Sequence, residues 1–215
     1  MAIARDSHTF KGQTLGTPVT WSHTCTGSNL ALFVGIRNQS SNSDDVTSVT
    51  YNGVAMTLIP GGKINNNGAY VYLYYLFAPA TGTNTVSVST SNAADTVTGF
   101  SVSYTGVKQS GMPDASNTAT SATSSISASL TTVANNCWYI AIEGNNQNTI
   151  SSTGGGLTLL DQTGGAGSAD SNGSVAIGTY SPSFTLGGTS SSAMVVASFA
   201  PAPVVVSGGF FLAAQ

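Results

Sequence analysis

Charged side chains are scarce in this sequence. Its 215 residues include only five Lys or Arg and eight Asp or Glu, which is 6% of the chain, against about a quarter of an average soluble protein. The five basic residues are scattered and the formal net charge is −3, so there is no basic stripe for nucleic acid phosphates. A basic amphipathic segment for a membrane surface is missing as well. We therefore expect neither nucleic acid nor membrane as a partner.

Long apolar runs and a cysteine framework are also missing. No run approaches the roughly 18 uncharged apolar residues of a membrane-spanning helix. The first residues, MAIARDSHTFKG, lack the apolar core of a secretory signal. These features predict a protein that is made and folded in the cytoplasm. The two cysteines, Cys25 and Cys137, are too few for a disulfide framework, and we expect them to be buried free thiols.

The sequence does contain evenly spaced apolar residues, separated by Ser, Thr, Asn and Gly. About a dozen short alternating segments recur at roughly ten-residue spacing without a helical period, which is typical of a sandwich or jelly roll. We expect an all-β fold, an antiparallel two-sheet sandwich of jelly-roll-like type with extended terminal arms. Residues 1–17 are interpreted as an N-terminal arm or edge strand, 18–201 as a single β-sandwich domain, and 202–215 as a C-terminal apolar arm.

The strongest local signals lie between residues 46 and 89. Asn52-Gly53 stands between two runs rich in Val, Thr and Tyr, and this pair accepts the positive φ angles of a two-residue turn, so a hairpin is predicted over 46–59. Residues 69–77 are apolar or aromatic at nearly every position, which predicts a central strand covered on both faces. The stretches 109–124 and 151–173 are poor in apolar residues, the second interrupted only near Leu157, and we expect loops there.

Candidate catalytic residues are few. His8 and His23 are the only histidines, neither accompanies a G-x-S-x-G motif, and His23 alternates with Trp21 on the inward side of a strand. Glu143 is the only glutamate. A buried carboxyl group there could act as a raised-pKa acid, but a strand-end carboxylate is more often solvated or bonded to backbone. We therefore expect no catalytic site.

Metal and sugar sites are equally weakly indicated. Asp170-Ser171-Asn172-Gly173 begins like a calcium loop but lacks the closing glutamate, and Asp44-Asp45 is more typical of a solvated turn. We expect neither a metal nor a cofactor. Tyr70, Tyr72 and Tyr74 share one face of a strand and could stack on sugar rings, although core packing is the commoner outcome for such a row.

Three segments carry a resemblance to a known group. VTSVTYNGVAMT (46–57), YLYYLFAPATGTNTVSV (72–88) and AMVVASFAP (193–201) resemble a widespread group of phage and environmental β-sandwich proteins that occur in tail-fibre or head-decoration contexts. The resemblance implies the fold and a place on a virion. It supplies no catalytic residues.

The chain is therefore predicted to be a non-enzymatic phage virion structural protein, a capsid decoration or cement protein. Its expected partners are copies of itself and a major capsid or other virion protein, with assembly in the host cytoplasm. One alternative is a receptor-binding module of a tail or fibre, whose loops at 61–68 and 109–124 would contact host glycans. Another alternative is a glycan hydrolase that uses Glu143.

The segment after Pro203 is the candidate for an assembly contact. It is either one more strand of its own domain or an apolar arm that docks on a neighbouring subunit. The predicted interface residues are Val204, Val205, Val206, Phe210, Phe211 and Leu212.

Overall fold

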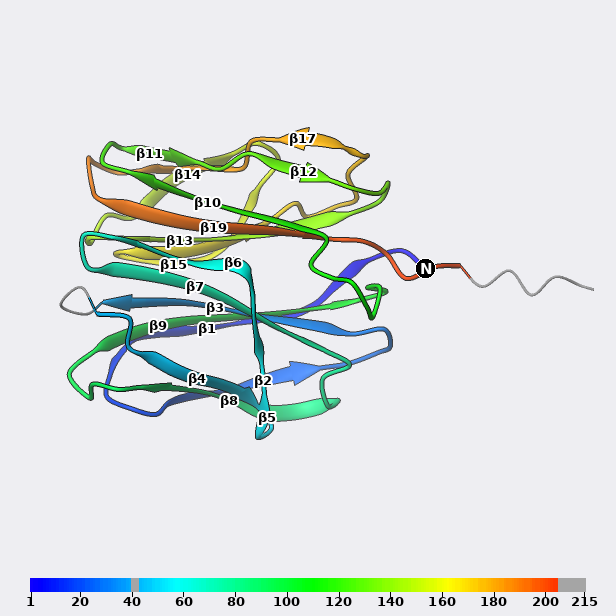
Figure 1. Ribbon diagram of the computed structural model, residues 1–215, viewed down its shortest axis with the longest axis horizontal. Helices are drawn as coiled ribbons and strands as arrows, with labels where there is room; N and C mark the ends of the chain where they lie inside the picture. The colour runs from blue at the N-terminus through cyan, green and yellow to red at the C-terminus, as the bar shows by residue number, and fades with distance from the viewer. Residues whose placement is uncertain (40–42, 205–215) are drawn as a thin grey trace, which may run out of the picture.

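Antiparallel β-strands build the whole of the described chain. The computed structural model describes residues 1–39 and 43–204, which contain nineteen strands and no helix (Figure 1). These two ranges accordingly hold no apolar helix of membrane-spanning length. The all-β prediction is confirmed, but the described strands form five hydrogen-bonded sheets where the sequence suggested two.

Two five-stranded sheets lie in the middle of the stack (Figure 1). The lower inner sheet has the spatial order β1-β9-β3-β7-β6. Its strands are β1 (Ala4–Leu15), β3 (Ala31–Gln39), β6 (Thr57–Asn66), β7 (Ala69–Phe77) and β9 (Thr96–Thr105). The upper inner sheet has the order β10-β19-β13-β16-β15. Its strands are β10 (Ala115–Ser121), β13 (Trp138–Asn145), β15 (Thr158–Thr163), β16 (Ala166–Asp170) and β19 (Ser192–Phe199).

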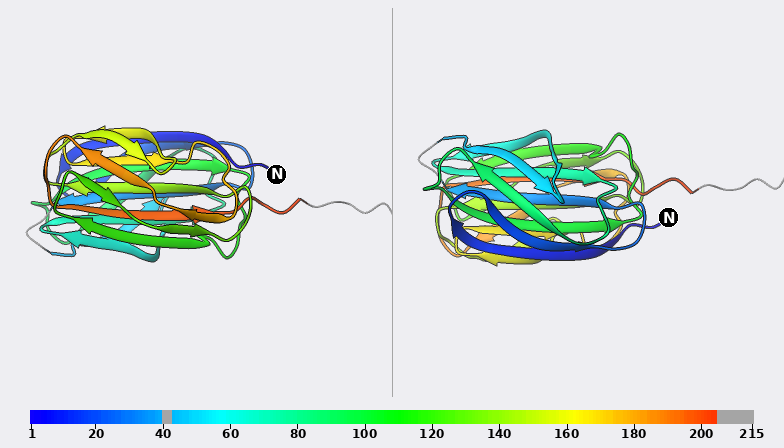
Figure 2. Two further views of the ribbon diagram at one scale, coloured as in Figure 1. Left: turned by 90° about the horizontal axis from the view of Figure 1, so that it is seen from above. Right: turned by 90° about the horizontal axis from the view of Figure 1, so that it is seen from below.

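An outer layer covers each inner sheet. The lower outer sheet, β2-β8-β4-β5, contains β2 (Val19–Cys25), β4 (Val46–Tyr51), β5 (Val54–Ala55) and β8 (Gly82–Thr90). The upper outer layer consists of two small sheets, β11-β18-β14 and β12-β17. Their strands are β11 (Ser125–Ser127), β12 (Leu130–Thr132), β14 (Ile150–Gly154), β17 (Gly178–Tyr180) and β18 (Ser183–Leu186). Figure 2 looks onto these two layers from above and from below.

The upper half of the molecule repeats the strand order of the lower half. Each inner sheet begins with the first strand of its half, followed by the last strand, β9 or β19. The remaining inner strands also correspond, β3-β7-β6 to β13-β16-β15. The outer order β2-β8-β4 has its counterpart in β11-β18-β14, where the short pair β12-β17 extends β11 and β18. The chain is thus composed of two topologically equivalent halves whose inner sheets face each other.

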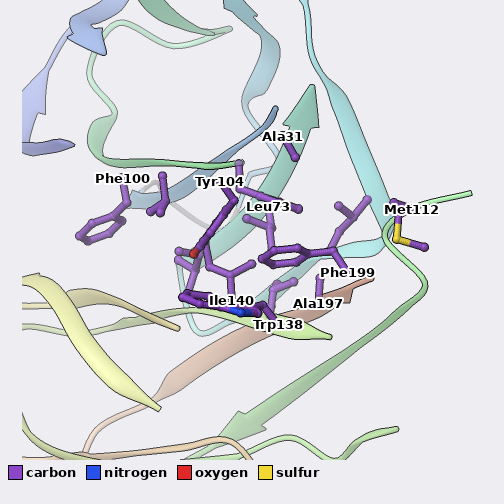
Figure 3. Packing of buried hydrophobic residues seen from close by; sticks show 14 of the residues in the cluster. Ala31, Leu73, Phe100, Tyr104, Met112, Trp138, Ile140, Ala197 and Phe199 are labelled. Atoms are coloured by element: carbon purple, nitrogen blue, oxygen red, sulfur yellow. The ribbon is translucent and has the colours of Figure 1, made fainter. Parts of the chain in front are cut away.

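Three apolar clusters lie between the four layers, and the central one joins the two inner sheets. At its aromatic centre, the ring of Phe199 from the upper inner sheet meets Phe33 and Tyr104 from the lower one; Figure 3 shows Phe199 and Tyr104 among the neighbouring core residues. The ring centroids are 4.9 Å and 4.7 Å apart, respectively. Because both faces of each inner sheet are covered, every residue of β13 and β19 is buried.

A buried polar bridge also joins the inner sheets at one edge. Asp170 of β16 is fully buried and accepts hydrogen bonds from Nε and Nη2 of Arg5 at 2.9 and 2.7 Å. The Tyr104 hydroxyl donates to the same carboxylate at 2.9 Å. Two donors from the lower half thus neutralise a buried charge of the upper half, as a buried carboxylate requires. This carboxylate is therefore engaged by Arg5 and Tyr104.

The structure confirms the predicted turn and the central strand over 69–77, whereas the hairpin predicted over 46–59 ends at Ala55. Asn52 and Gly53 have φ angles of 49° and 74° and form the turn between β4 and β5. The chain then leaves the outer sheet at Met56 and continues as β6 of the inner sheet. β7 lies between β3 and β6, as expected for a central strand.

The two predicted loops are wrong over much of their length. Residues 115–121 form the edge strand β10, and the stretch 151–173 contains most of β14 together with β15 and β16. Small residues suit these strands because the neighbouring elements approach closely. A Cβ atom on Gly167 would lie 2.0 Å from Cδ1 of Ile150. Residues 61–66 likewise belong to β6, with the turn at Asn67-Gly68.

Both ends of the described chain lie at the same end of the stack (Figure 1). The amino group of Met1 donates a hydrogen bond to the carbonyl of Ala202 at 3.3 Å, and β1 is an edge strand that pairs only with β9. Val204 is 73% exposed. The other predicted interface residues, Val205, Val206, Phe210, Phe211 and Leu212, lie outside the described residues. Cys25 and Cys137 are buried free thiols, as predicted.

The contact between the inner sheets can be tested at Gly35 of β3. A Cβ atom there would lie 2.3 Å from Cδ1 and 2.4 Å from Cγ1 of Ile142 in β13. We expect Gly35→Ala to lower the free energy of unfolding by about 1–3 kcal/mol because the core becomes overpacked. The measurement is urea-induced unfolding.

The control for this substitution is Gly12→Ala in β1, where the nearest atom to an added Cβ, Cε1 of Phe10, is 3.9 Å away. We expect Gly12→Ala to change the free energy of unfolding by no more than about 0.5 kcal/mol. The double variant with Gly35→Ala and Ile142→Ala should lose less free energy of unfolding than the two single variants lose together. Strict additivity would contradict the direct contact between Gly35 and Ile142.

Candidate functional site: two uncharged outer faces

The outer layers of the molecule carry no charge. All Lys, Arg, Asp and Glu residues of the chain lie outside the nine outer strands. On these strands the inward positions are apolar or buried, and the outward positions are mainly Ser and Thr. This arrangement follows from the period of two along a strand, because each outer sheet is covered on one face only.

The lower outer face is a regular array of hydroxyl groups. Thr20, Ser22 and Thr24 of β2 point outward, opposite Ser87, Thr85 and Thr83 of β8. Two hydroxyl groups of the array bond directly, with Oγ1 of Thr24 2.8 Å from Oγ1 of Thr83. The outward Ser and Thr residues of this face are Thr20, Ser22, Thr24, Ser48, Thr50, Thr83, Thr85, Ser87 and Ser89.

The upper outer face has the same character. Ser125 and Ser127 of β11 lie opposite Thr185 and Ser183 of β18. On the small sheet beside them, Oγ1 of Thr131 in β12 lies 2.9 Å from Oγ1 of Thr179 in β17. The outward Ser and Thr residues here are Ser125, Ser127, Thr131, Ser152, Thr179, Ser183 and Thr185. The molecule therefore presents two uncharged hydroxyl faces on opposite sides.

Beneath the lower face, His23 is held in a buried hydrogen-bond network. Its Nε2 lies 3.1 Å from Oγ of Ser103, and its Nδ1 lies 3.1 Å from Oγ of Ser101. Ser103 in turn donates its hydroxyl proton to Asp6 at 2.7 Å. Since Ser103 has only one proton, it must accept from Nε2–H of His23. The histidine side chain therefore cannot act as a base toward this serine in the observed arrangement.

Burial explains the charge state of this histidine. His23 is 1% exposed, and its burial lowers the pKa to about 4, opposed in part by the charge of Asp6. The imidazole is consequently neutral near pH 7 and serves to connect β1, β2 and β9. The inward direction expected for His23 is confirmed. His8 lies in β1, where its Nδ1 is 2.8 Å from Oδ2 of Asp161.

Glu143 is fully buried in β13, so the expectation of a solvated or backbone-bonded carboxylate is wrong. Its Oε2 accepts a hydrogen bond from the Asn145 side chain at 3.1 Å, and its Oε1 has no partner among the described residues. Burial raises the pKa of Glu143 to about 8, while Asn145 and Arg37 act in the opposite direction. The alternating strand pattern explains this position, because Glu143 shares the buried face of β13 with Tyr139 and Ala141.

Arg37 is a buried basic residue whose charge acts on the Glu143 carboxyl group. It lies in β3, fully buried, and Nη2 donates to the carbonyl of Asn145 at 2.8 Å. Burial lowers the pKa of Arg37, and the charge of Glu143 raises it. No ion pair joins Arg37 to Glu143 in the part of the chain that the structure describes. Sequence reasoning did not single out Arg37.

The tyrosine row is packed between layers. Tyr72 is 1% exposed, and Tyr70 and Tyr74 are partly buried against the cluster between the lower sheets. The rings stack along β7 with centroids 5.9 Å and 6.4 Å apart. Tyr72 also donates to Oδ1 of Asp44 at 2.7 Å. Core packing, the commoner outcome, is therefore what the structure shows for this row.

Comparisons with known proteins add no family. No protein-family model, no curated protein and no solved structure matches this chain.

The buried carboxyl group of Glu143 predicts a specific pH dependence of stability. Its folded pKa of about 8 lies above the unfolded value of 4.5, so the folded state binds the proton more tightly. The associated stabilisation is complete below pH 4.5 and is lost as the pH rises towards 8. As the pH rises from 5 to 7.5, we expect the free energy of unfolding of Glu143→Gln to increase by about 3 kcal/mol relative to that of the natural chain.

The measurement is urea-induced unfolding of both proteins across this pH range. In the folded state both side chains are largely uncharged at pH 5, so the difference there reports mainly shape and hydrogen bonding, and its change with rising pH reports the titration of Glu143. Stability profiles that run parallel would show that Glu143 does not titrate in this way.

Proposed function

We propose that this chain is a non-enzymatic structural protein of a phage particle and that it decorates or cements the capsid. The observation that carries the proposal is the pair of uncharged Ser and Thr faces on opposite sides of the molecule. The resemblance of residues 46–57, 72–88 and 193–201 to phage β-sandwich proteins supplies the virion as the setting.

The chemistry of these faces favours contact with similar surfaces. A hydroxyl group both donates and accepts hydrogen bonds, so a hydroxyl face is complementary to another copy of itself. No charge has to be desolvated or brought near a like charge. Ser and Thr side chains also lose less conformational freedom on contact than long charged ones. Copies of this chain, or another uncharged virion surface, are therefore suitable partners.

The same chemistry implies weak binding per contact. Interfaces of high affinity rely on buried aromatic and Arg anchors, and Ser and Thr contribute little energy. A particle compensates because it presents many sites at once, so that a molecule with two faces gains avidity from multivalent attachment. An opposite pair of weak faces thus suits a decorating protein better than a soluble receptor.

The topology is compatible with the proposed setting. We propose that each half is a jelly-roll-like sandwich, in which β5 and β6 act as one strand that changes sheet at Met56. The inner order β1-β9-β3-β7 and the outer order β2-β8-β4-β5 are those of two interlocked Greek keys, and the upper half has the inner order β10-β19-β13-β16 with the three-stranded outer order β11-β18-β14. Jelly rolls are widespread in viral capsid proteins.

The two alternatives have less support. A hydrolase using Glu143 requires substrate to reach a carboxyl group that is fully buried. A glycan-binding module would use the predicted loops 61–68 and 109–124, but β6 occupies most of the first stretch, β10 occupies the middle of the second, and the two strands lie side by side. Oγ of Ser116 donates to the carbonyl of Pro60 at 2.5 Å, and Asn66 donates to the carbonyl of Ser121 at 2.7 Å.

The role of the faces can be tested with charged substitutions. We expect Ser22→Lys with Ser48→Lys, or Ser127→Lys with Thr131→Lys, to weaken self-association and attachment to phage particles about tenfold or more, because each change buries charge in a contact. Sedimentation velocity of the full chain and co-sedimentation with particles from the source of the sequence provide the measurements.

The matched control is Ser28→Lys with Ser110→Lys, at two exposed loop serines outside the outer strands. This control should self-associate and attach to phage particles as the natural chain does. All variants should retain the natural melting temperature. Undiminished assembly of both face variants would contradict the proposal. Binding to a glycan array by the natural chain, without binding to particles, would favour the receptor-binding alternative.

A further inference from the structure

A pocket lies at the end of the stack where the two ends of the described chain meet. Its volume is about 380 Å³. No charged side chain of the described residues lines it, and most of its lining is apolar. The apolar residues of the lining are Met1, Ala2, Pro201, Ala202 and Val204. The pocket is therefore suited to an uncharged, apolar ligand.

Exposed apolar side chains gather at this end of the molecule. Asn136 and Ser174 complete the lining of the pocket, and the two segments to which they belong also carry Val133 and Ile177. Six large apolar side chains are exposed in the described chain, namely Met1, Leu15, Val54, Val133, Ile177 and Val204. All except Leu15 and Val54 belong to the pocket or to these two segments. A single exposed apolar residue is normal, but such a gathering marks an interaction site.

The described chain leaves the stack beside this pocket. The backbone of Ala202 is held on both sides, because its N–H donates to the carbonyl of Gly106 at 2.7 Å and its carbonyl accepts from the amino group of Met1. Pro203 has no N–H group with which to continue this pairing, and Val204 is 73% exposed. Figure 1 shows this last described stretch, coloured red, running away from the strands. The chain is thus directed away from its own domain at Val204.

The sequence that follows Val204 matches the pocket in chemistry. Residues 205–215 read VVSGGFFLAAQ and contain no charged residue. Phe210 is the sixth residue after Val204, and six extended residues span up to about 20 Å. Aromatic side chains bury a large apolar area at a small cost in conformational freedom. Phe210 and Phe211 can therefore reach and fill a pocket on an adjoining molecule.

We propose that this pocket binds Phe210 and Phe211 of a second copy of the chain, so that two copies exchange these segments reciprocally. Because the pocket lies beside the point where the chain leaves the domain, a two-fold axis at this end brings each segment next to the pocket of the other copy. Such an exchange closes on itself and makes two equal contacts at once, which strengthens both. The contact lies at the end of the stack and not on the outer faces, so it goes beyond the proposed attachment to a particle.

Two variants of the full chain disrupt the two sides of this contact. Phe210→Ser with Phe211→Ser removes the aromatic side chains, and Ser174→Lys places a charge at an exposed position of the pocket lining. We expect the natural chain to form a dimer and each variant to raise the dissociation constant of that dimer about tenfold or more. Sedimentation velocity over a series of concentrations provides the measurement.

Mixing the two variants distinguishes exchange between copies from binding within one copy. Each variant keeps the side of the contact that the other has lost, so an equimolar mixture should form heterodimers at concentrations where neither variant dimerises alone. If Phe210 and Phe211 bind the pocket of their own chain, the natural chain stays monomeric and the mixture forms no heterodimer. That outcome would overturn the proposal.

The controls lie away from this end of the stack. Thr189→Lys changes an exposed residue between β18 and β19, and Leu15→Ser changes an exposed apolar residue at the far end of β1. Both variants should dimerise as the natural chain does. The outer-face variant Ser22→Lys with Ser48→Lys should also retain this dimer, so the two proposals can fail separately.

Thermal unfolding shows whether each variant is folded. All variants should keep the natural melting temperature, and Val204→Lys replaces Ser174→Lys if the latter does not, since Val204 also lines the pocket and is exposed. Undiminished dimer formation by Phe210→Ser with Phe211→Ser would contradict the exchange.

Discussion

The apolar contact between the two inner sheets is the constraint on which the rest of the structure depends. Because each inner sheet is covered on both faces, its central strands have no side that can carry solvated charge. Phe33, Tyr104 and Phe199 form the centre of this contact. Where charge does enter the inner sheets, it is neutralised by a partner, as in the Arg5–Asp170 bridge, or its pKa is shifted by burial, as at Glu143. This architecture accounts for the scarcity of charge in the central strands of the inner sheets.

The outer layers follow from the same stacking. Each outer sheet has one buried face and one free face, so apolar residues and hydroxyl residues alternate along its strands. Nothing in the packing requires the free faces to lack charge, since a solvated Lys or Glu would fit there equally well. The complete absence of charge from nine outer strands is therefore the feature that we connect with function. We propose that the reason is a role in assembly, since a surface for solubility alone would not lack charge.

Polar groups inside the molecule act as connections between layers. His23 joins Ser101 and Ser103 of β9 beneath the lower face, and Arg37 of β3 reaches the carbonyl of Asn145 across the central layer. The two halves share one strand order but differ in such details. In the upper half, for example, Asn145 donates to the carboxyl group of Glu143, whose Oε1 has no hydrogen-bond partner among the described residues.

The local sequence was sufficient to predict several elements of this structure. Asn52-Gly53 specified its turn, the apolar run 69–77 specified a central strand, and the alternation around Trp21 and His23 specified which side faces inward. The strands within 109–124 and 151–173 escaped prediction, because small residues and glycines lie in β-sheets only when a neighbouring element approaches closely. The sequence by itself determined the β class, the uncharged strand faces and the buried thiols, all of which depend on residue type and period. Only the tertiary structure decided the four-layer stack, the full burial of Glu143 and the bridge between Arg5 and Asp170, because these depend on which distant strands pair.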